Sequence, residues 1–211
     1  MALKIGFDVD GVLANFIPAY QALVVLADGR NLFHPDDVNN PPCWNWPEFR
    51  GYSPELMTQV WGKIIKSPNF WFNLKPILSN VASLAMVVKD MEWKHDVYYV
   101  TSRPGLRAKR QTEAWLVECL PYDEDVIPTV LLASDKGAAA KTLKLDVYID
   151  DNLDNIKSVL RESPKTRAYL LDKSYNQGDV SVESYFPEYG PRTGIRVPTL
   201  AAMLDAELPN L

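Results

Sequence analysis

The stretch that decides the fold is Lys4–Asn15, KIGFDVDGVLAN, in which a short apolar run ends in two aspartates and a glycine. The apolar run predicts a buried β-strand. Asp8 and Asp10 are two positions apart, so their side chains leave the strand on the same side and can face one small ligand. A solvated turn or a calcium loop of the pattern D-x-[DN]-x-[DN]-G is the alternative, but Val12 replaces an acid and an apolar strand precedes the motif. We therefore interpret the pair as a nucleophile site.

The composition is that of an ordinary globular protein. The chain has 211 residues, of which 47% are hydrophobic and 23% charged, enough for one main domain with a modest insertion. Its formal net charge of -5 argues against general affinity for nucleic acid or anionic membranes. Cys43 and Cys119 lack the spacing of metal ligands and fit a reducing compartment. With no signal-peptide pattern and no run of about 18 apolar residues, we expect a cytoplasmic protein without membrane contact.

Segments with the β-branched and aromatic character of buried strands recur along the chain. They are Leu3–Val9, Asp96–Val100, Pro128–Ala133, Asp146–Ile149 and Arg167–Leu171. Helices are expected at Pro104–Leu120, Ser134–Lys144, Leu153–Arg161 and Pro198–Glu207. Strands and helices that alternate in this way predict an α/β fold, a parallel sheet with helices on both faces.

The long gap between the first two strands predicts a small helical cap inserted after the first strand. Residues Phe16–Lys75 hold four of the six tryptophans, Trp44, Trp46, Trp61 and Trp71. We expect a core domain of residues 1–15 and 76–211 and a cap domain of residues 16–75. Asn176–Gly194, rich in Gly, Pro, Tyr and Ser, predicts an ordered surface loop.

Reactive side chains follow four of the predicted strands at the points where these strands end. They are Asp8 and Asp10, then Thr101, Ser102 and Arg103, then Ser134, Asp135 and Lys136, and finally Asp150 and Asp151. Each group alone could be a helix N-cap or a surface charge. In open α/β sheets, however, ligands bind beyond the carboxyl ends of the strands, and all four groups are expected at that edge.

Together these groups suit phosphoryl transfer. Acids at Asp8 and Asp151, with a main-chain carbonyl near Asp10, supply the oxygen ligands that Mg²⁺ prefers. Lys136 and the hydroxyl of Thr101 or Ser102 could hold the remaining phosphate oxygens. Their donors would offset the charge that keeps a carboxylate from attacking an anion.

The motifs DVDGVLA, VTSRP, SDK and YIDDN, in this order, resemble the four motifs of the haloacid dehalogenase superfamily. Within that superfamily the chain is most similar to the 5′(3′)-deoxyribonucleotidases. Ser67–Pro76, SPNFWFNLKP, resembles their paired aromatics followed by a leucine and a proline. The resemblance implies a Rossmann-like core and a Mg²⁺-dependent phosphatase that forms an aspartyl phosphate.

The resemblance also implies roles for individual residues. Asp8 would be the nucleophile, and Asp10 the general acid that later acts as the base. Thr101 and Lys136 would bind phosphate. Mg²⁺ would be held by Asp8, the Asp10 carbonyl and Asp151, with Asp150 supporting the metal site from close by.

The sequence departs from the nucleotidase pattern in two places. Arg103 stands between Ser102 and Pro104, so we expect an extra cation that reaches the phosphate or a ribose. The cap stretch CWNWPEFRGY matches only loosely, which leaves the base and the sugar open. Candidates for a stacking pocket are Phe16, Trp44, Trp46, Phe70 and Trp71, although aromatic residues in so small a cap could equally form its core.

Arg103, Arg107, Lys109 and Arg110 form the dense basic cluster of the sequence. We interpret it as the solvated face of a helix that begins at Pro104. The alternative is a track for a nucleic-acid backbone, which would suit a polynucleotide 3′-phosphatase of the same superfamily.

The leading hypothesis is a phosphatase of deoxynucleoside monophosphates of the 5′-nucleotidase type, with a small-molecule substrate rather than nucleic acid. A phosphatase of another small metabolite is a further alternative. Outside enzymes, the chain could be an inactive nucleotide-binding or scaffold protein. The choice between 5′ and 3′ phosphate and the oligomeric state stay open, a homodimer being one option.

Overall fold

The computed structural model describes residues 2–123, 125–177 and 194–209. Its main sheet has the strand order β5 (Val130–Leu132), β4 (Asp96–Thr101), β1 (Lys4–Phe7), β6 (Val147–Asp150), β7 (Arg167–Leu171) and β8 (Gly194–Val197). All five pairings are parallel. The predicted parallel sheet is therefore confirmed, and β1 lies in its interior with β4 and β6 as neighbours.

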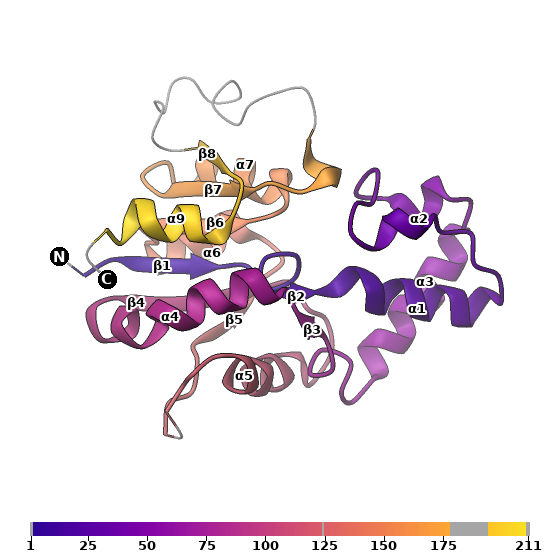
Figure 1. Ribbon diagram of the computed structural model, residues 1–211, viewed down its shortest axis with the longest axis horizontal. Helices are drawn as coiled ribbons and strands as arrows, with labels where there is room; N and C mark the ends of the chain where they lie inside the picture. Colours follow the sequence, from indigo (N-terminus) through magenta and orange to yellow (C-terminus); the bar gives the residue numbers. More distant parts are fainter. Residues whose placement is uncertain (1, 124, 178–193, 210–211) are drawn as a thin grey trace.

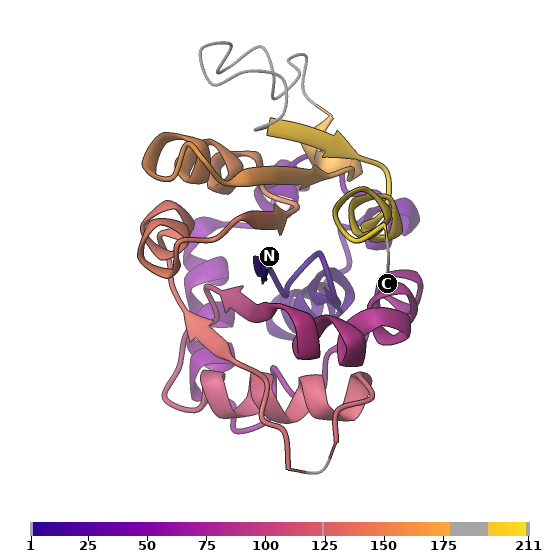
Figure 2. The same cartoon turned by 90° about the vertical axis from the view of Figure 1, so that its left-hand side faces the viewer.

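Helices cover both faces of this sheet, as predicted (Figures 1 and 2). On one face lie α4 (Leu78–Lys94) and α9 (Leu200–Glu207), and on the other lie α6 (Lys136–Leu143) and α7 (Leu153–Glu162). A fifth helix, α5 (Ala108–Cys119), packs beside the edge strand β5. Within the described part of the chain, no helix has the length and apolar character needed to cross a membrane.

Several predicted boundaries were wrong. The helix expected at Pro104 begins at Ala108, because Gly105 has a φ of 112°, which is incompatible with a helix. The edge strand expected at Pro128–Ala133 is shorter, at Val130–Leu132. Strand β8 was missed, since Gly194 was assigned to a loop. Most of that predicted loop, residues 178–193, lies outside the described residues, and its first residue, Asn176, ends a short 3-10 helix, η2 (Ser174–Asn176).

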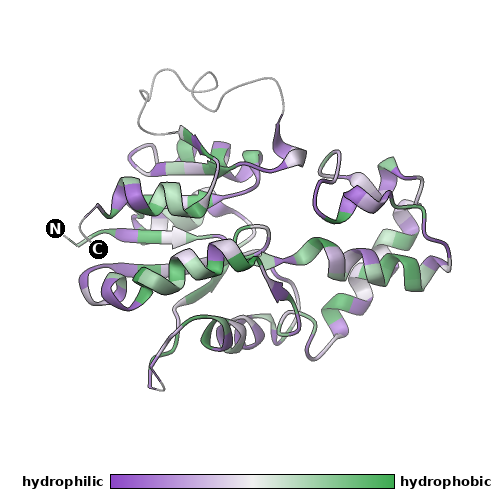
Figure 3. Cartoon of the chain, viewed as in Figure 1, coloured by the Kyte–Doolittle hydropathy of each residue, from purple (hydrophilic) through white to green (hydrophobic). Residues whose placement is uncertain are grey.

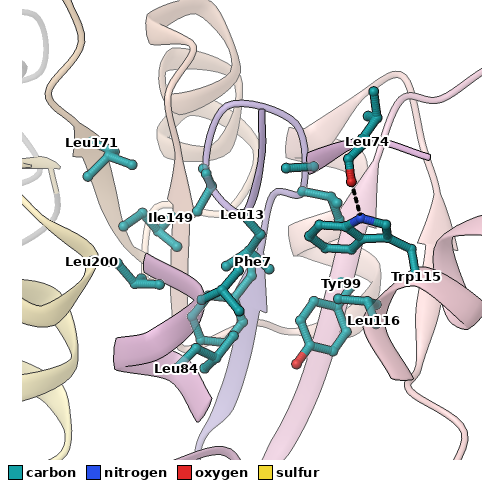
Figure 4. Packing of buried hydrophobic residues seen from close by; sticks show 14 of the residues in the cluster. Phe7, Leu13, Leu74, Leu84, Tyr99, Trp115, Leu116, Ile149, Leu171 and Leu200 are labelled. Carbon is teal, nitrogen blue, oxygen red and sulfur yellow. Dashed lines mark hydrogen bonds between the residues drawn. The ribbon is translucent and has the colours of Figure 1, made fainter. Parts of the chain in front are cut away.

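The core packs around interior strands of the sheet, among them the neighbours β1 and β4 (Figure 4). Phe7 of β1 and Tyr99 of β4 stack with ring centroids 6.0 Å apart, and both are fully buried. Trp115 of α5 is also buried, and its indole Nε1 donates a hydrogen bond of 2.7 Å to the Leu74 carbonyl. This bond ties the segment before β3 (Lys75–Pro76) to the core.

A helical segment lies beyond one end of the sheet (Figure 1). It contains α1 (Phe16–Asp28), η1 (Pro35–Val38), α2 (Trp46–Phe49) and α3 (Pro54–Lys66). The chain leaves the sheet through β2 (Ala14–Asn15) and returns through β3, and these two strands pair antiparallel. Apolar residues occur on α1 and α3 as well as around the sheet (Figure 3).

Candidate active site

Three buried carboxylates meet where β1 and β6 end. Asp8 is 6% exposed, Asp150 0% and Asp151 3%, and one oxygen from each lies within 4.8 Å of the others. The two strand ends are joined by a hydrogen bond of 2.9 Å that Asp8 N donates to the Ile149 carbonyl. Because β1 and β6 are parallel neighbours, their carboxyl ends bring these acids to one edge of the sheet.

Lys136 provides the cation beside these acids. Its side chain is fully buried, and Nζ donates to Asp8 Oδ1 at 2.8 Å and to the Val100 carbonyl at 2.6 Å. Lys136 is the first residue of α6, whose N-cap, Asp135, accepts a hydrogen bond from Ala138 N at 3.1 Å. These two bonds use two of the three donors of the ammonium group.

Asp150 is held by protein donors on both of its oxygens. Oδ1 accepts from Asn152 N at 2.8 Å, and Oδ2 accepts from the Tyr148 hydroxyl at 2.7 Å. The Asn155 amide also donates to both oxygens, at 3.1 and 3.0 Å. Asp150 is thus fixed by its neighbours and has less capacity left for a ligand.

Asp151 is held differently. The Tyr175 hydroxyl of η2 donates to Asp151 Oδ2, and Asn176 Nδ2 donates to the Asp151 carbonyl at 2.8 Å. Gly11, with a φ of 83°, lies so close that a Cβ there would be 1.9 Å from Asp151 Oδ2. Only glycine fits this approach, which explains the glycine of the DVDG motif.

The electrostatics of the cluster favour a bound cation. Burial raises the pKa of Asp8 well above its usual value, although Lys136 opposes the shift. Burial also raises the pKa of Asp150, and burial together with Asp150 raises the pKa of Asp151 to about 7. Lys136 contacts Asp8 and the charge of Lys173 acts on Asp151, yet burial still raises the pKa of all three acids, so a hard divalent cation would fit this set of oxygen ligands and offset their charge.

These shifts predict how the stability of the metal-free protein depends on pH. An acid with a raised folded-state pKa stabilises the fold while protonated, and this contribution is lost as pH rises from about 4 through about 7 for Asp151. We expect the Tm without metal to fall by several degrees from pH 5 to pH 8, since about 1 kcal/mol moves Tm by about 2–4 °C in a chain of this size.

Asp151→Asn is the control for this measurement. Its Tm, from calorimetry in the presence of a chelator, should depend less on pH than that of the wild type. The comparison cancels the opposite effect of His95, whose pKa is lowered by burial, because both proteins contain it. Equal pH dependence in the two proteins would contradict the assignment of the shift to Asp151.

Asp10 lies beside the cluster and is paired with Arg103. Arg103 Nε donates to Asp10 Oδ2 at 2.9 Å, and Nη2 donates to Oδ1 at 2.8 Å. Thr101, buried at the end of β4, donates to Asp10 Oδ2 at 3.4 Å. Ser102 is exposed, and its hydroxyl donates to the Ala133 carbonyl at 3.0 Å.

This pairing differs from what we expected of Arg103. The predicted cation for a phosphate or a ribose is engaged with Asp10, and the side chain is 0% exposed. The prediction that Arg103 joins a solvated basic face was also wrong, because the residue precedes α5 and is buried. Arg107, Lys109 and Arg110 are exposed, as expected, and Lys109 pairs with Glu113 at 3.5 Å.

A pocket of about 750 Å³ joins these polar groups to the helical segment. Of the site residues predicted from sequence, it is lined by Asp8, Asp10, Phe16, Trp44, Trp71, Thr101, Ser102, Arg103, Asp150 and Asp151. Lys136 is not among the lining residues and acts on the pocket only through its contact with Asp8. Such a volume suits a molecule the size of a nucleotide.

The aromatic candidates differ in their placement. Trp46 also lines the pocket, whereas Phe70 is not among the lining residues and packs edge-on against Trp71 at 5.0 Å. Trp71 is 2% exposed and stacks on Phe16 at 6.0 Å, so it supports the wall of the pocket. Trp44 is 56% exposed and meets Tyr175 at 5.4 Å, which leaves most of its ring available.

Sequence reasoning missed the residues that follow β7. Lys173 and Tyr175 line the pocket, and Asn176 holds the backbone of Asp151. The rule that located the other groups, that reactive side chains follow strand ends, applies to β7 as well. Applied to the predicted strand Arg167–Leu171, it would have indicated this segment.

Comparisons with known proteins agree with the fold. A family model described as 5′ nucleotidase, deoxy (pyrimidine), cytosolic type C protein matches residues 2–183. A candidate nucleotidase of Oceanobacillus iheyensis is 33% identical over 102 residues, which cover 47% of this chain and 52% of that protein. A second, from Bacillus cereus, is 23% identical over 180 residues, which cover 83% of this chain and 89% of that protein.

Solved structures share the architecture. A haloacid dehalogenase-like hydrolase from Streptococcus pneumoniae superposes with a TM-score of 0.59 at 13% identity, covering 98% of this chain and 99% of that chain. A structure described as that of a predicted phosphatase from Clostridium acetobutylicum gives a TM-score of 0.57 at 14% identity, with complete coverage of both chains. At such low identity these similarities establish the fold alone.

Proposed function

We propose that this chain, which belongs to the 5′ nucleotidase, deoxy (pyrimidine), cytosolic type C family, hydrolyses the phosphate of deoxynucleoside monophosphates. Family membership makes it a phosphoric monoester hydrolase with a haloacid dehalogenase-like fold. The finer proposal rests on one observation: the buried carboxylates and the aromatic side chains line the same pocket. That arrangement fits a substrate with a phosphate at one end and a flat base at the other.

Asp8 is the proposed nucleophile. Its carboxylate oxygen attacks phosphorus, an Asp8–phosphorus bond forms, and the bond from phosphorus to the substrate oxygen breaks. The ammonium group of Lys136, 2.8 Å from Asp8 Oδ1, offsets the repulsion between the carboxylate and the anionic phosphate. Thr101, at the end of β4, is the proposed second donor to the phosphate.

Asp10 is the proposed acid and base. In the first step its proton goes to the oxygen of the leaving alcohol, so the nucleoside departs neutral. In the second step Asp10 accepts a proton from water, the water oxygen attacks phosphorus, and the Asp8–phosphorus bond breaks. Inorganic phosphate is released, Asp8 is again a carboxylate, and Asp10 again carries its proton.

The proposed cofactor is Mg²⁺. Asp8, Asp151 and the Asp10 carbonyl would hold it, and Asp150 would support the site through the bonds that fix β6 and α7. The ion would supply positive charge to the phosphate oxygens during transfer. Its fit rests on the oxygen donors and on the uncompensated negative charge of the buried cluster.

The helical segment, residues 16–75, is the proposed cap domain, with residues 1–15 and 76–211 as the core domain. The pocket supports this division, because its walls include Phe16, Trp44 and Trp61 from the segment and Asp8 and Asp151 from the sheet. A substrate in this pocket would touch both parts.

A panel of phosphate esters tests the substrate proposal. Deoxynucleoside 5′-monophosphates should exceed sugar phosphates in kcat/KM by about tenfold or more, if one stacking contact of about 1.4 kcal/mol is made in the transition state. Trp44→Ala should remove most of this preference while sparing p-nitrophenyl phosphate, which lacks a base. Release of free phosphate is the readout, and pyrimidine nucleotides are the proposed favourites.

Trp93→Ala is the matched control, because Trp93 is an exposed tryptophan of α4 and does not line the pocket. It should leave every kcat/KM unchanged. If 3′-phosphorylated oligonucleotides are preferred and their turnover weakens steeply with salt, the nucleotide proposal fails. The polynucleotide phosphatase would then take its place, with Arg107 and Arg110 as backbone contacts.

A further inference from the structure

Arg103 is a charged side chain that the fold buries completely beside the active site. Its side chain is 0% exposed, and two of its nitrogens donate to the two oxygens of Asp10 at 2.9 and 2.8 Å. A third nitrogen, Nη1, donates to Thr112 Oγ1 at 3.0 Å, and Thr112 in turn donates to the Ala108 carbonyl at 2.8 Å. The guanidinium group is therefore oriented from α5 and directed at Asp10.

Two indole rings hold the same guanidinium group. Its central carbon lies 5.1 Å from the ring centroid of Trp71 and 5.8 Å from that of Trp115. Trp71 is fixed by a bond of 3.1 Å from its Nε1 to the Pro104 carbonyl, and Trp115 by its bond to the Leu74 carbonyl. Cations are attracted to aromatic faces, so these rings restrain the arginine further.

The buried ion pair of Arg103 and Asp10 is not explained by its contribution to stability alone. A buried ion pair costs desolvation energy that its Coulomb attraction often only balances, so it is weak support for a purely structural role. A two-pronged arginine fork, in contrast, fixes the plane of a carboxylate in a way that a lysine does not. Asp10 needs such a restraint, because its side chain is 24% exposed at the wall of the pocket.

We propose that Arg103 is a positioning residue for Asp10. It holds the Asp10 carboxylate in one orientation, within hydrogen-bond reach of the oxygen that leaves phosphorus, and makes no contact with the substrate. Proton transfer depends on such reach, so a loosely held Asp10 carboxyl group would donate its proton poorly. This inference rests on the proposed phosphatase mechanism and concerns its acid–base step.

A series of aryl phosphates, from p-nitrophenyl to phenyl phosphate, separates positioning from structure. Good leaving groups need little protonation, whereas poor ones depend on Asp10. In Arg103→Met, kcat/KM should fall by about 100-fold for phenyl phosphate but by less than about fivefold for p-nitrophenyl phosphate. Arg103→Lys, which keeps the charge without the fork, should lie between the wild type and Arg103→Met.

Arg110→Met is the matched control, since Arg110 is exposed on the same helix that orients Arg103. It should leave the dependence on the leaving group unchanged. A double-mutant cycle adds a sharper test: in an Asp10→Asn background, Arg103→Met should cause little further loss for phenyl phosphate, because the two residues act as one unit.

The outcomes separate this inference from the proposed function. Equal losses for both esters, or additive losses in the cycle, would make Arg103 structural and overturn the inference while leaving the phosphatase proposal intact. Should Arg103→Met fail to fold, Arg103→Lys must show the same selective loss for phenyl phosphate. If kcat/KM of Arg103→Lys depends on the leaving group as it does in the wild type, the inference is overturned. A wild type that hydrolyses aryl phosphates but no nucleotide would refute the substrate class only. A wild type without any phosphatase activity would overturn both.

Discussion

Asp8→Asn is expected to abolish turnover, lowering kcat by about 10³-fold or more. The amide is nearly isosteric with the carboxylate but is a very poor nucleophile, so no Asp8–phosphorus bond would form. Lys136 could still donate to the amide oxygen from its buried position, so the local contacts would survive. The variant should therefore fold like the wild type, as circular dichroism and thermal unfolding can measure.

Two measurements sharpen this prediction. Asp90→Asn changes an exposed acid of α4 in the same chemical way and should leave turnover unchanged. Rapid acid quenching of the wild type during turnover should trap phosphate on the protein, and Asp8→Asn should trap none. If a preparation free of host phosphatases keeps more than a few per cent of wild-type turnover, Asp8 is not the nucleophile.

Much of the fold was predictable because local patterns and tertiary position agree. The apolar segments that became β1, β4, β6 and β7 are buried on both faces, so their hydrophobicity marks them without any knowledge of their partners. Once the strands are parallel, their carboxyl ends must lie at one edge. This rule alone placed Asp8, Lys136 and Asp151 near one another, although their chemical roles remain proposals.

The rest depends on contacts that no local pattern encodes. Arg103 follows an exposed serine in a basic stretch, and only the fold shows that Trp71 and Trp115 enclose it. The start of α5 depends on a positive φ at Gly105, which lies against the Ile65 carbonyl. Tyr175 reaches Asp151 across 24 residues of sequence. Each of these features is set by a distant partner, and hydrophobic periodicity carries no information about it.

The aromatic residues of the proposed cap illustrate the same limit. Trp44 and Trp46 are neighbours in sequence, yet the first is 56% exposed and the second 5%. Helix α2, which begins at Trp46, has only four residues, so no repeating hydrophobic pattern distinguishes its inner face from its outer face. Stacking candidates could therefore be named from sequence but not ranked.

Asp151→Asn is expected to raise the Mg²⁺ concentration needed for half-maximal activity by about 100-fold, or to abolish activity, because it removes a charged oxygen ligand. Titration of chelated wild type and variant with Mg²⁺ measures this. Ca²⁺, which favours longer bonds and more ligands, should inhibit rather than replace Mg²⁺. Activity of the wild type that survives exhaustive chelation would contradict a metal-dependent mechanism.

Asp150→Asn provides the contrast, because the hydrogen bonds of the Asp150 carboxylate differ from those of Asp151. Both Asp150 oxygens accept protein donors, and Asn155 Nδ2 donates to both, so in either orientation the NH₂ group of an amide would face the Asn155 donor. A buried donor that faces another donor costs about 1–3 kcal/mol. Asp150→Asn should therefore lower Tm clearly while raising the Mg²⁺ requirement less than Asp151→Asn does.

Without metal, Asp151→Asn should instead keep or raise Tm at pH 8, since it removes an acid whose pKa is raised to about 7. If the two variants behave alike in both measurements, the proposed division between metal ligand and supporting residue is wrong.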